Sequence, residues 1–264
     1  MDGALIAVRF LHYGAAMLLW GQLAYGGAPK GRGALWGLML LTGGLWLMLE
    51  AGVAGNGWPS VTDPAVIRAL LADTPVGQAW VMHMALVALL GPALHRGAGR
   101  TLPLAGAALA SLALVGHAAM DQGGLGMLHR LNAALHLLAA GYWLGALPAV
   151  LRGLGAPGEE ARLMRFSRWG HLAVAGVLLT GLGNTLLVLH HLPDDLASAY
   201  QGLLIAKMGL VAAMVALAVL NRYVFVPRLA RGGLPGLRRG TLAEIALGIA
   251  VLALVSAFAT FDPV

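Results

Sequence analysis

Cysteine is absent from this chain of 264 residues, and charged residues are scarce. Without cysteine, disulfides, thiolate metal sites and cysteine nucleophiles are excluded. Charged residues make up 11% of the chain, whereas soluble domains carry roughly 25%. No long polar stretch is present that could form a separate soluble domain. The composition therefore argues against a soluble globular protein.

Motifs of common soluble enzymes are missing too. The sequence has no P-loop, no dinucleotide-binding fingerprint, no HExxH and no CxxC. The glycine-rich stretch 153–158 follows no strand pattern and lacks a Lys-Ser/Thr pair, so we expect a loop there. We therefore expect a transporter or a binding protein rather than an enzyme, and no direct use of ATP by this chain.

Hydrophobic residues, in contrast, make up 59% of the chain, more than a core of this size can bury. A helix that spans the hydrocarbon of a bilayer needs about 20 apolar residues, and eight segments meet that requirement. The predicted fold class is an all-α polytopic membrane protein, with residues 1–264 forming a single membrane domain. The predicted spans are 4–25, 33–53, 77–95, 102–120, 126–151, 165–190, 200–225 and 240–260.

The distribution of lysine and arginine indicates how these spans are oriented. Cytoplasmic loops carry an excess of both residues, and thirteen of the seventeen basic residues fall in or beside alternate connections. The alternation predicts that both termini are periplasmic. The net charge of +6 thus follows membrane topology, so we expect the lipid bilayer, and no nucleic acid, as a partner. The thirteen residues are Lys30, Arg32, Arg96, Arg100, Arg152, Arg162, Arg165, Arg168, Arg222, Arg228, Arg231, Arg238 and Arg239.

The connection 54–76 is the longest on the outer side, and it contains a helix signal. Asp63 is a typical N-cap residue, and Pro64 suits the first helical position. The apolar residues that follow are too few to span the membrane. We therefore expect a short helix that lies on the outer surface.

A faint internal repeat relates the two halves of the chain at an offset of 124 residues. The offset aligns His12 with His136, and His83 with Lys207. Thr42 aligns with Thr180 once a difference in loop length is allowed. Four spans in each half would give a parallel repeat with a pseudo-twofold axis along the membrane normal. The predicted half-repeats are residues 1–125 and 126–264.

Polar side chains lie inside the predicted spans, mostly toward the outer side. Such side chains are costly in lipid and usually face the interior of the bundle. His129, Asn132 and His136 share one helix face, and Thr180 and Asn184 share another. The candidate metal ligands are His12, His83, His117, His129, His136, Met120 and Met127. The candidate supporting residues are Arg9, Glu50, Asn132, Asn184 and Lys207.

Imidazole and thioether without thiolate suit copper, as Cu(I) or Cu(II), better than zinc or iron. A plainer interpretation stands beside this one: a histidine in a span can simply bond a neighbouring helix, and a methionine can simply fill an interface. Arg9 and Lys207 are the bases that lie well inside predicted helices. Each can form a structural pair with Glu50, or it can bind an anionic group such as a propionate. Near the other end, Glu244 has Arg222 or Arg228 as possible counter-charges.

Several short stretches, taken in their order and spacing, resemble the copper resistance protein D (CopD) family of bacterial inner-membrane proteins. The resemblance covers nearly the whole chain. The stretches are 9–14, 70–80, 116–119, 143–147, 166–167, 180–184, 200–207, 221–222 and 227–229, together with His136.

The resemblance implies an inner-membrane protein that binds copper on the periplasmic side and moves it toward the cytoplasm. It also implies a small periplasmic copper-binding protein as a partner. Residues at positions that match the family's motifs are His12, His117, His136, Asn184 and Lys207. His83 departs from the family's pattern, in which a basic residue such as arginine is expected.

Two other functions stay open at this point. One is a haem b protein or haem-linked oxidoreductase with two axial histidines, for which His12, His117 and His136 are candidates. The other is a scaffold without a metal. For copper, we predict an uptake site of His117, His129 and a methionine, with His136 as a deeper site beside Asn132. His117 and His136 are then expected to line an outer polar cavity.

Overall fold

The computed structural model describes residues 1–26, 31–96, 98–115 and 123–258. Helices dominate this part of the chain, which contains no strand. The all-α fold predicted from hydropathy is confirmed. The elements are α1 (Asp2–Tyr25), α2 (Arg32–Ala54), η1 (Trp58–Thr62), α3 (Pro64–Asp73), α4 (Pro75–Leu94), α5 (Ala98–Ser111), η2 (Leu112–Leu114), α6 (Gly123–Gly153), α7 (Glu159–Leu189), α8 (Ala199–Leu220), η4 (Asn221–Phe225), η5 (Val226–Arg231) and α9 (Leu234–Phe258).

Within the described residues, seven helical stretches are long and apolar enough to cross a membrane. They correspond to all the predicted spans except 102–120. That segment is helical as far as Leu114, and its apolar helix Arg100–Leu114 falls short of a full span. Residues 116–122 lie outside the described part of the chain. A polytopic membrane protein is therefore confirmed, whereas the count of eight spans stays a prediction.

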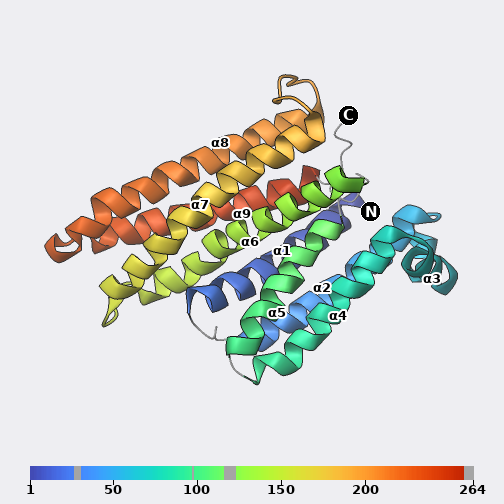
Figure 1. Cartoon of the computed structure of the whole chain (residues 1–264), viewed down its shortest axis with the longest axis horizontal. Helices are drawn as coiled ribbons and strands as arrows, with labels where there is room; N and C mark the ends of the chain where they lie inside the picture. The colour runs from blue at the N-terminus through green and yellow to red at the C-terminus, as the bar shows by residue number, and fades with distance from the viewer. Residues whose placement is uncertain (27–30, 97, 116–122, 259–264) are drawn as a thin grey trace.

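The short helix predicted in the connection 54–76 is confirmed as α3. The Asp63 carboxylate accepts a hydrogen bond from the Ala65 amide at 2.8 Å, and Pro64 occupies the first turn. Both features satisfy or remove donors that a helix N-terminus leaves unpaired. No residue of α3 is buried, and the helix lies beside the ends of α2 and α4 (Figure 1).

The helices form two groups that meet at α1 and α6. The largest hydrophobic cluster joins α1, α2, α4 and α5, and smaller clusters join α6 to α7, α8 and α9 (Figure 1). Gly21 on α1 lies against Gly141 and Gly145 on α6 so closely that a Cβ would overlap the facing backbone. Small residues permit this approach in membranes. The α1–α6 contact is therefore the seam between the two groups.

α7 packs chiefly on α6, and α8 packs chiefly on α9. Large apolar side chains point outward from α7, with Leu172 62% and Leu179 71% exposed. Such exposure would be unfavourable in water and suits contact with lipid. Between α7 and α8, cavities remain inside the second group of helices.

Candidate functional site

The first group of helices encloses a pair of histidines with no exposed surface. His12 on α1 and His83 on α4 are each 0% exposed. Their Nε2 atoms lie 2.9 Å apart. Seventy-one residues separate them in the sequence, so only the packing of α1 against its neighbours brings them together. Both residues were candidate ligands in the sequence, but their pairing was not predicted.

The partners of the Nδ1 atoms determine which nitrogen of each ring carries the proton. The Thr42 hydroxyl lies 2.6 Å from the Leu38 carbonyl and 2.9 Å from His12 Nδ1. When it donates to that carbonyl, its oxygen accepts from His12 Nδ1. Ser111 donates to the Ala108 carbonyl at 2.8 Å. His83 Nδ1 donates to that carbonyl at 3.1 Å and to the Ser111 oxygen at 2.9 Å, so the neutral His83 ring carries its proton on Nδ1.

The two Nε2 atoms face each other at hydrogen-bond distance. When Thr42 donates to the Leu38 carbonyl, both Nε2 atoms carry lone pairs and a cation fits between them; when Thr42 donates to His12 Nδ1, His12 Nε2 donates to His83 Nε2. A metal-ligating histidine usually donates its other N–H to a carbonyl or similar acceptor, which orients the ring. The arrangement around His12 and His83 is of this kind and suits a proton or a metal ion bound by both rings.

Aromatic rings and a thioether surround the pair. His12 packs against Trp46 and Trp80 with ring centroids 5.7 and 5.8 Å apart, and His83 stacks on Trp80 at 5.0 Å. Met84 lies on the same side of His12 as Gly43. A Cβ added to Gly43 would lie 2.5 Å from Met84 Sδ and 3.5 Å from His12 Cε1, so the sulfur and the ring are near each other. The surroundings are thus apolar, and the nearby sulfur is a soft donor.

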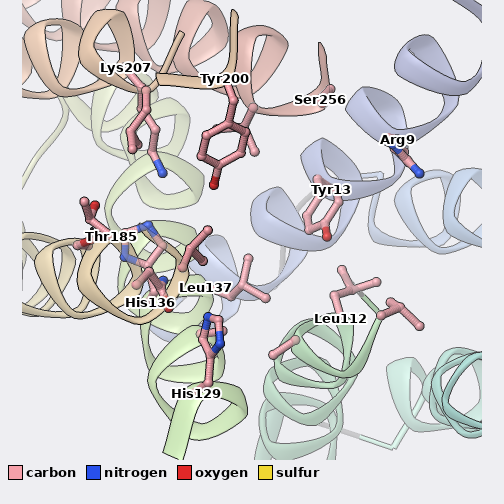
Figure 2. A pocket seen from close by; sticks show the side chains of 18 of the residues that line it. Arg9, Tyr13, Leu112, His129, His136, Leu137, Thr185, Tyr200, Lys207 and Ser256 are labelled. Atoms are coloured by element: carbon pink, nitrogen blue, oxygen red, sulfur yellow. Dashed lines mark hydrogen bonds between the residues drawn. The ribbon is translucent and has the colours of Figure 1, made fainter. Parts of the chain in front are cut away.

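A second histidine repeats part of this arrangement on α6. His136 Nδ1 lies 2.9 Å from the Thr180 hydroxyl, which donates to the Gly176 carbonyl at 2.5 Å. His136 therefore also carries its proton on Nδ1. Lys207 on α8 takes the place that His83 has in the first group: it interacts electrostatically with His136, and its side chain points toward the ring (Figure 2).

His136 and Lys207 line a cavity of about 290 Å³ at the end of the bundle where α6 begins. His129, Tyr200 and Arg9 also line this cavity, and Figure 2 shows Tyr200 and His129 on opposite sides of it, with Arg9 on the side of α1. Trp46 also lines this cavity while its ring packs on His12. The Trp46 indole therefore lies between the cavity and the His12–His83 pair.

The supporting residues predicted from the sequence make defined contacts. Arg9 Nη2 lies 2.8 Å from Glu50 Oε1, so of the alternatives considered for Arg9 the structure contains the ion pair with Glu50. Glu50 also accepts a hydrogen bond from Trp46 Nε1 at 2.8 Å, which holds the indole in its orientation. Asn132 donates to Asn184 Oδ1 at 2.8 Å and to the Thr180 carbonyl at 2.9 Å, tying α6 to α7.

The predicted uptake site is placed only in part. His129 is 3% exposed and lines the cavity, whereas Met127 is 70% exposed and does not line it. His117 and Met120 lie outside the described residues, and so does the predicted approach of His117 to His136. Among the residues with described positions, no group of three or more histidine, aspartate or glutamate side chains could hold a metal. The His12–His83 pair is the closest approach to a metal site there.

Known proteins provide an independent comparison. Residues 1–127 match the family described as copper resistance protein D-like, N-terminal domain, and residues 160–258 match copper resistance protein D. The chain is 35% identical to the inner membrane protein YebZ of Escherichia coli K12, over 98% of each chain. It is 30% identical to copper resistance protein D of Pseudomonas syringae pv. tomato, over 99% of this chain and 97% of the relative.

A third relative is the copper transport protein CutJ of Bacillus subtilis 168, which is 30% identical over 81% of this chain and 43% of its own length. No solved structure matches the chain.

Proposed function

This chain belongs to the copper resistance protein D family, and we propose that it takes up copper on the periplasmic side of the inner membrane and binds it between His12 and His83. The names of two relatives, copper resistance protein D and copper transport protein CutJ, support membrane copper handling. The finer assignment rests on the paired Nε2 lone pairs at 2.9 Å.

Copper in its reduced form suits this pair better than other metals. Cu(I) accepts two nitrogen ligands in a linear arrangement, and soft thioethers also bind it. Metal–nitrogen bonds of about 2 Å need the two Nε2 atoms about 4 Å apart. The rings would therefore separate by about 1 Å when the ion enters, with Met84 beside them as a soft third donor.

Metal analysis and an absorption spectrum of the purified protein test this function together. We expect one copper per chain after loading with Cu(I), and no haem absorption. A haem band would favour the alternative of a haem b protein. Neither copper nor haem would favour the scaffold and overturn the proposal.

The outer cavity provides the route to the pair in this proposal. His129 in its wall would receive the ion, and displacement of the Trp46 ring would admit it to His12. A small periplasmic copper-binding protein is the proposed donor, docking where α6 and α8 begin. His117, Met120 and Met127 remain the predicted residues of first contact at that surface.

Replacing Thr42 by valine should weaken copper binding by about 10–100-fold, the range typical for losing a residue that hydrogen-bonds a metal ligand. Valine keeps the shape but removes the acceptor of the His12 Nδ1 proton, so the ring is free to place that proton on Nε2. Competition titration with a Cu(I) chelator measures the change. Thr101→Val is a matched control, because Thr101 is equally buried but bonds the Ala93 carbonyl. Equal affinities for the two variants would contradict the tautomer argument.

The orientation proposed here can be tested by reporter fusions in the connections. We expect a periplasmic signal from fusions within 54–75 and 191–199, and a cytoplasmic signal from fusions within 156–162 and 230–238. The reason is the excess of arginine in the latter two connections and their surroundings. A cytoplasmic signal from 54–75 would reverse the proposed direction of uptake.

A further inference from the structure

Three cavities follow one another along the bundle, the first between the two groups of helices and the other two within the second group. The outer cavity of about 290 Å³ shares His136 and Lys207 with a middle cavity of about 330 Å³. The middle cavity shares Trp143 and Leu178 with an inner cavity of about 360 Å³. The series therefore runs from the level of His129, past Trp143, to the arginine-rich end of α6–α9.

A buried carboxylate lines the inner cavity. Glu244 on α9 is 3% exposed. Its Oε1 accepts a hydrogen bond from Asn221 Nδ2, and its Oε2 accepts one from Trp143 Nε1 at 3.3 Å. Asn221 is the first residue of the π-helical turn η4, and its own Oδ1 has no hydrogen-bond partner. Such turns are frequent at functional sites.

These contacts differ from the arginine counter-charge considered for Glu244 from the sequence. The contacts on its carboxylate come from the neutral donors of Asn221 and Trp143. Two neutral donors do not cancel a full negative charge inside a membrane, where an ionised carboxylate is costly. Binding a cation removes this cost.

The proton is the cation that this site can hold. Within the described residues no cluster of three or more potential metal ligands includes Glu244. Its oxygens are hard donors that soft Cu(I) does not favour. A proton needs a single lone pair, and each oxygen keeps one while it accepts its present hydrogen bond.

Other titratable and charged groups around Glu244 lie at the mouth of the inner cavity or beyond it. His171 on α7 faces Tyr223, with Nε2 3.3 Å from the hydroxyl, and both side chains are exposed. Arg222 lines the same wall. Of the remaining elements that pack on α9, α1 brings Tyr25 into a cluster with Leu237, and η5 carries arginines in its last turn. His171, Tyr223 and Glu244 thus line one cavity.

We propose that the three cavities form a water-accessible path through α6–α9, and that Glu244 binds and releases a proton on this path. Trp143 lies where the middle and inner cavities meet, and its indole is held by the Glu244 carboxylate. Protonation of Glu244 removes an acceptor charge and loosens the indole, so the proton and the width of this neck are coupled. The inference goes beyond copper binding and needs no copper for its tests.

Infrared difference spectroscopy of the full-length protein in lipid tests the proton site. Between about pH 5 and pH 9 we expect a protonated-carboxyl band to appear as pH falls, and Glu244→Gln should remove it. Glu160→Gln is the control, because Glu160 is exposed at the start of α7 and its band should not overlap a buried one. If the spectra of wild type and Glu244→Gln change identically with pH, Glu244 does not exchange protons and the proposal fails.

Cysteine accessibility tests the path, because the chain has no cysteine of its own. Val174 lines the inner cavity, whereas Leu172 on the same helix points outward and is 62% exposed. Thiols react as thiolates, which form in water and not in lipid. We therefore expect a charged, membrane-impermeant thiol reagent to label Val174→Cys and to spare Leu172→Cys. Glu160→Cys, at an exposed position, is the positive control for the reagent. Equal labelling of Val174→Cys and Leu172→Cys would contradict the path. If Glu160→Cys reacts and Val174→Cys does not, the cavity is closed to water and the path is wrong.

Discussion

Replacing either His12 or His83 by alanine is expected to abolish stoichiometric copper binding by the purified protein. Each ring supplies one of the two Nε2 atoms that face each other at 2.9 Å. The loss of one of two ligands must lower the affinity by more than the roughly 100-fold that losing a ligand's hydrogen-bond partner can cost. Equilibrium dialysis with a Cu(I) chelator measures the affinity, and metal analysis measures the stoichiometry.

The control for this pair is His95→Ala, because His95 is exposed at the end of α4 and faces no metal donor within the described structure. Both buried replacements leave a cavity, so folding must be checked separately. His83→Gln keeps a polar side chain of similar length, and its thermal unfolding without copper should stay near that of the wild type. If folded His12→Ala or His83→Gln still binds one copper ion with unchanged affinity, the pair is structural and the proposed site is wrong.

Hydropathy predicted much of this fold. Each of the seven long helices lies within a few residues of a predicted span, because the length of a span and its apolar character are local properties. The cap of α3 was also local, since Asp63 and Pro64 act within one turn. The segment 102–120 was harder to predict, because its described helix ends at Leu114 and gives way to a 3-10 turn.

The site itself depends on contacts that no local pattern contains. The site joins three helices. His12 contacts Thr42, which is 30 residues away in the sequence, and His83, which is 71 residues away. Depth in the membrane identified the histidines as candidates, but it could not indicate which rings meet. It also placed Met127 level with His129, although the structure exposes one and buries the other. Neighbours in sequence at the end of a helix can face opposite ways, which depth alone does not resolve.

The internal repeat, in contrast, aligned residues that have matching hydrogen bonds. In both groups a threonine hydroxyl bonds a carbonyl of its own helix and accepts the Nδ1 proton of a histidine: Thr42 for His12, and Thr180 for His136. The proposal that residues 1–125 and 126–264 are parallel repeats gains support from this match. The offset of 124 residues also pairs His83 with Lys207. His83 lies against His12 Nε2, and Lys207 interacts electrostatically with the His136 ring.

The two groups then differ in the source of the cation. In the first, two Nε2 atoms face each other at 2.9 Å, and a proton or a metal ion can bind between them. In the second, the ammonium of Lys207 can supply the positive charge to His136 Nε2 through its own side chain. A lysine ammonium is a donor without a lone pair, so it excludes a metal ion from the place that it occupies. The first half would thus bind copper, whereas in the second half the Lys207 ammonium takes the position of the metal ion.

Lys207→His should therefore create a second copper site and raise the stoichiometry from one to two ions per chain. The new imidazole would face His136, whose ring is already oriented by Thr180. His83→Lys is the reciprocal change, and it should leave the protein without tightly bound copper, because an ammonium would then face His12. Metal analysis of the two variants beside the wild type gives the three expected values of two, zero and one. Lys207→Met is the control for simple loss of charge, since it offers sulfur without a second imidazole. The prediction is wrong if Lys207→His unfolds at the wild-type temperature and still binds one copper ion. The two halves would then share the threonine–histidine hydrogen bond but not the geometry of a copper site.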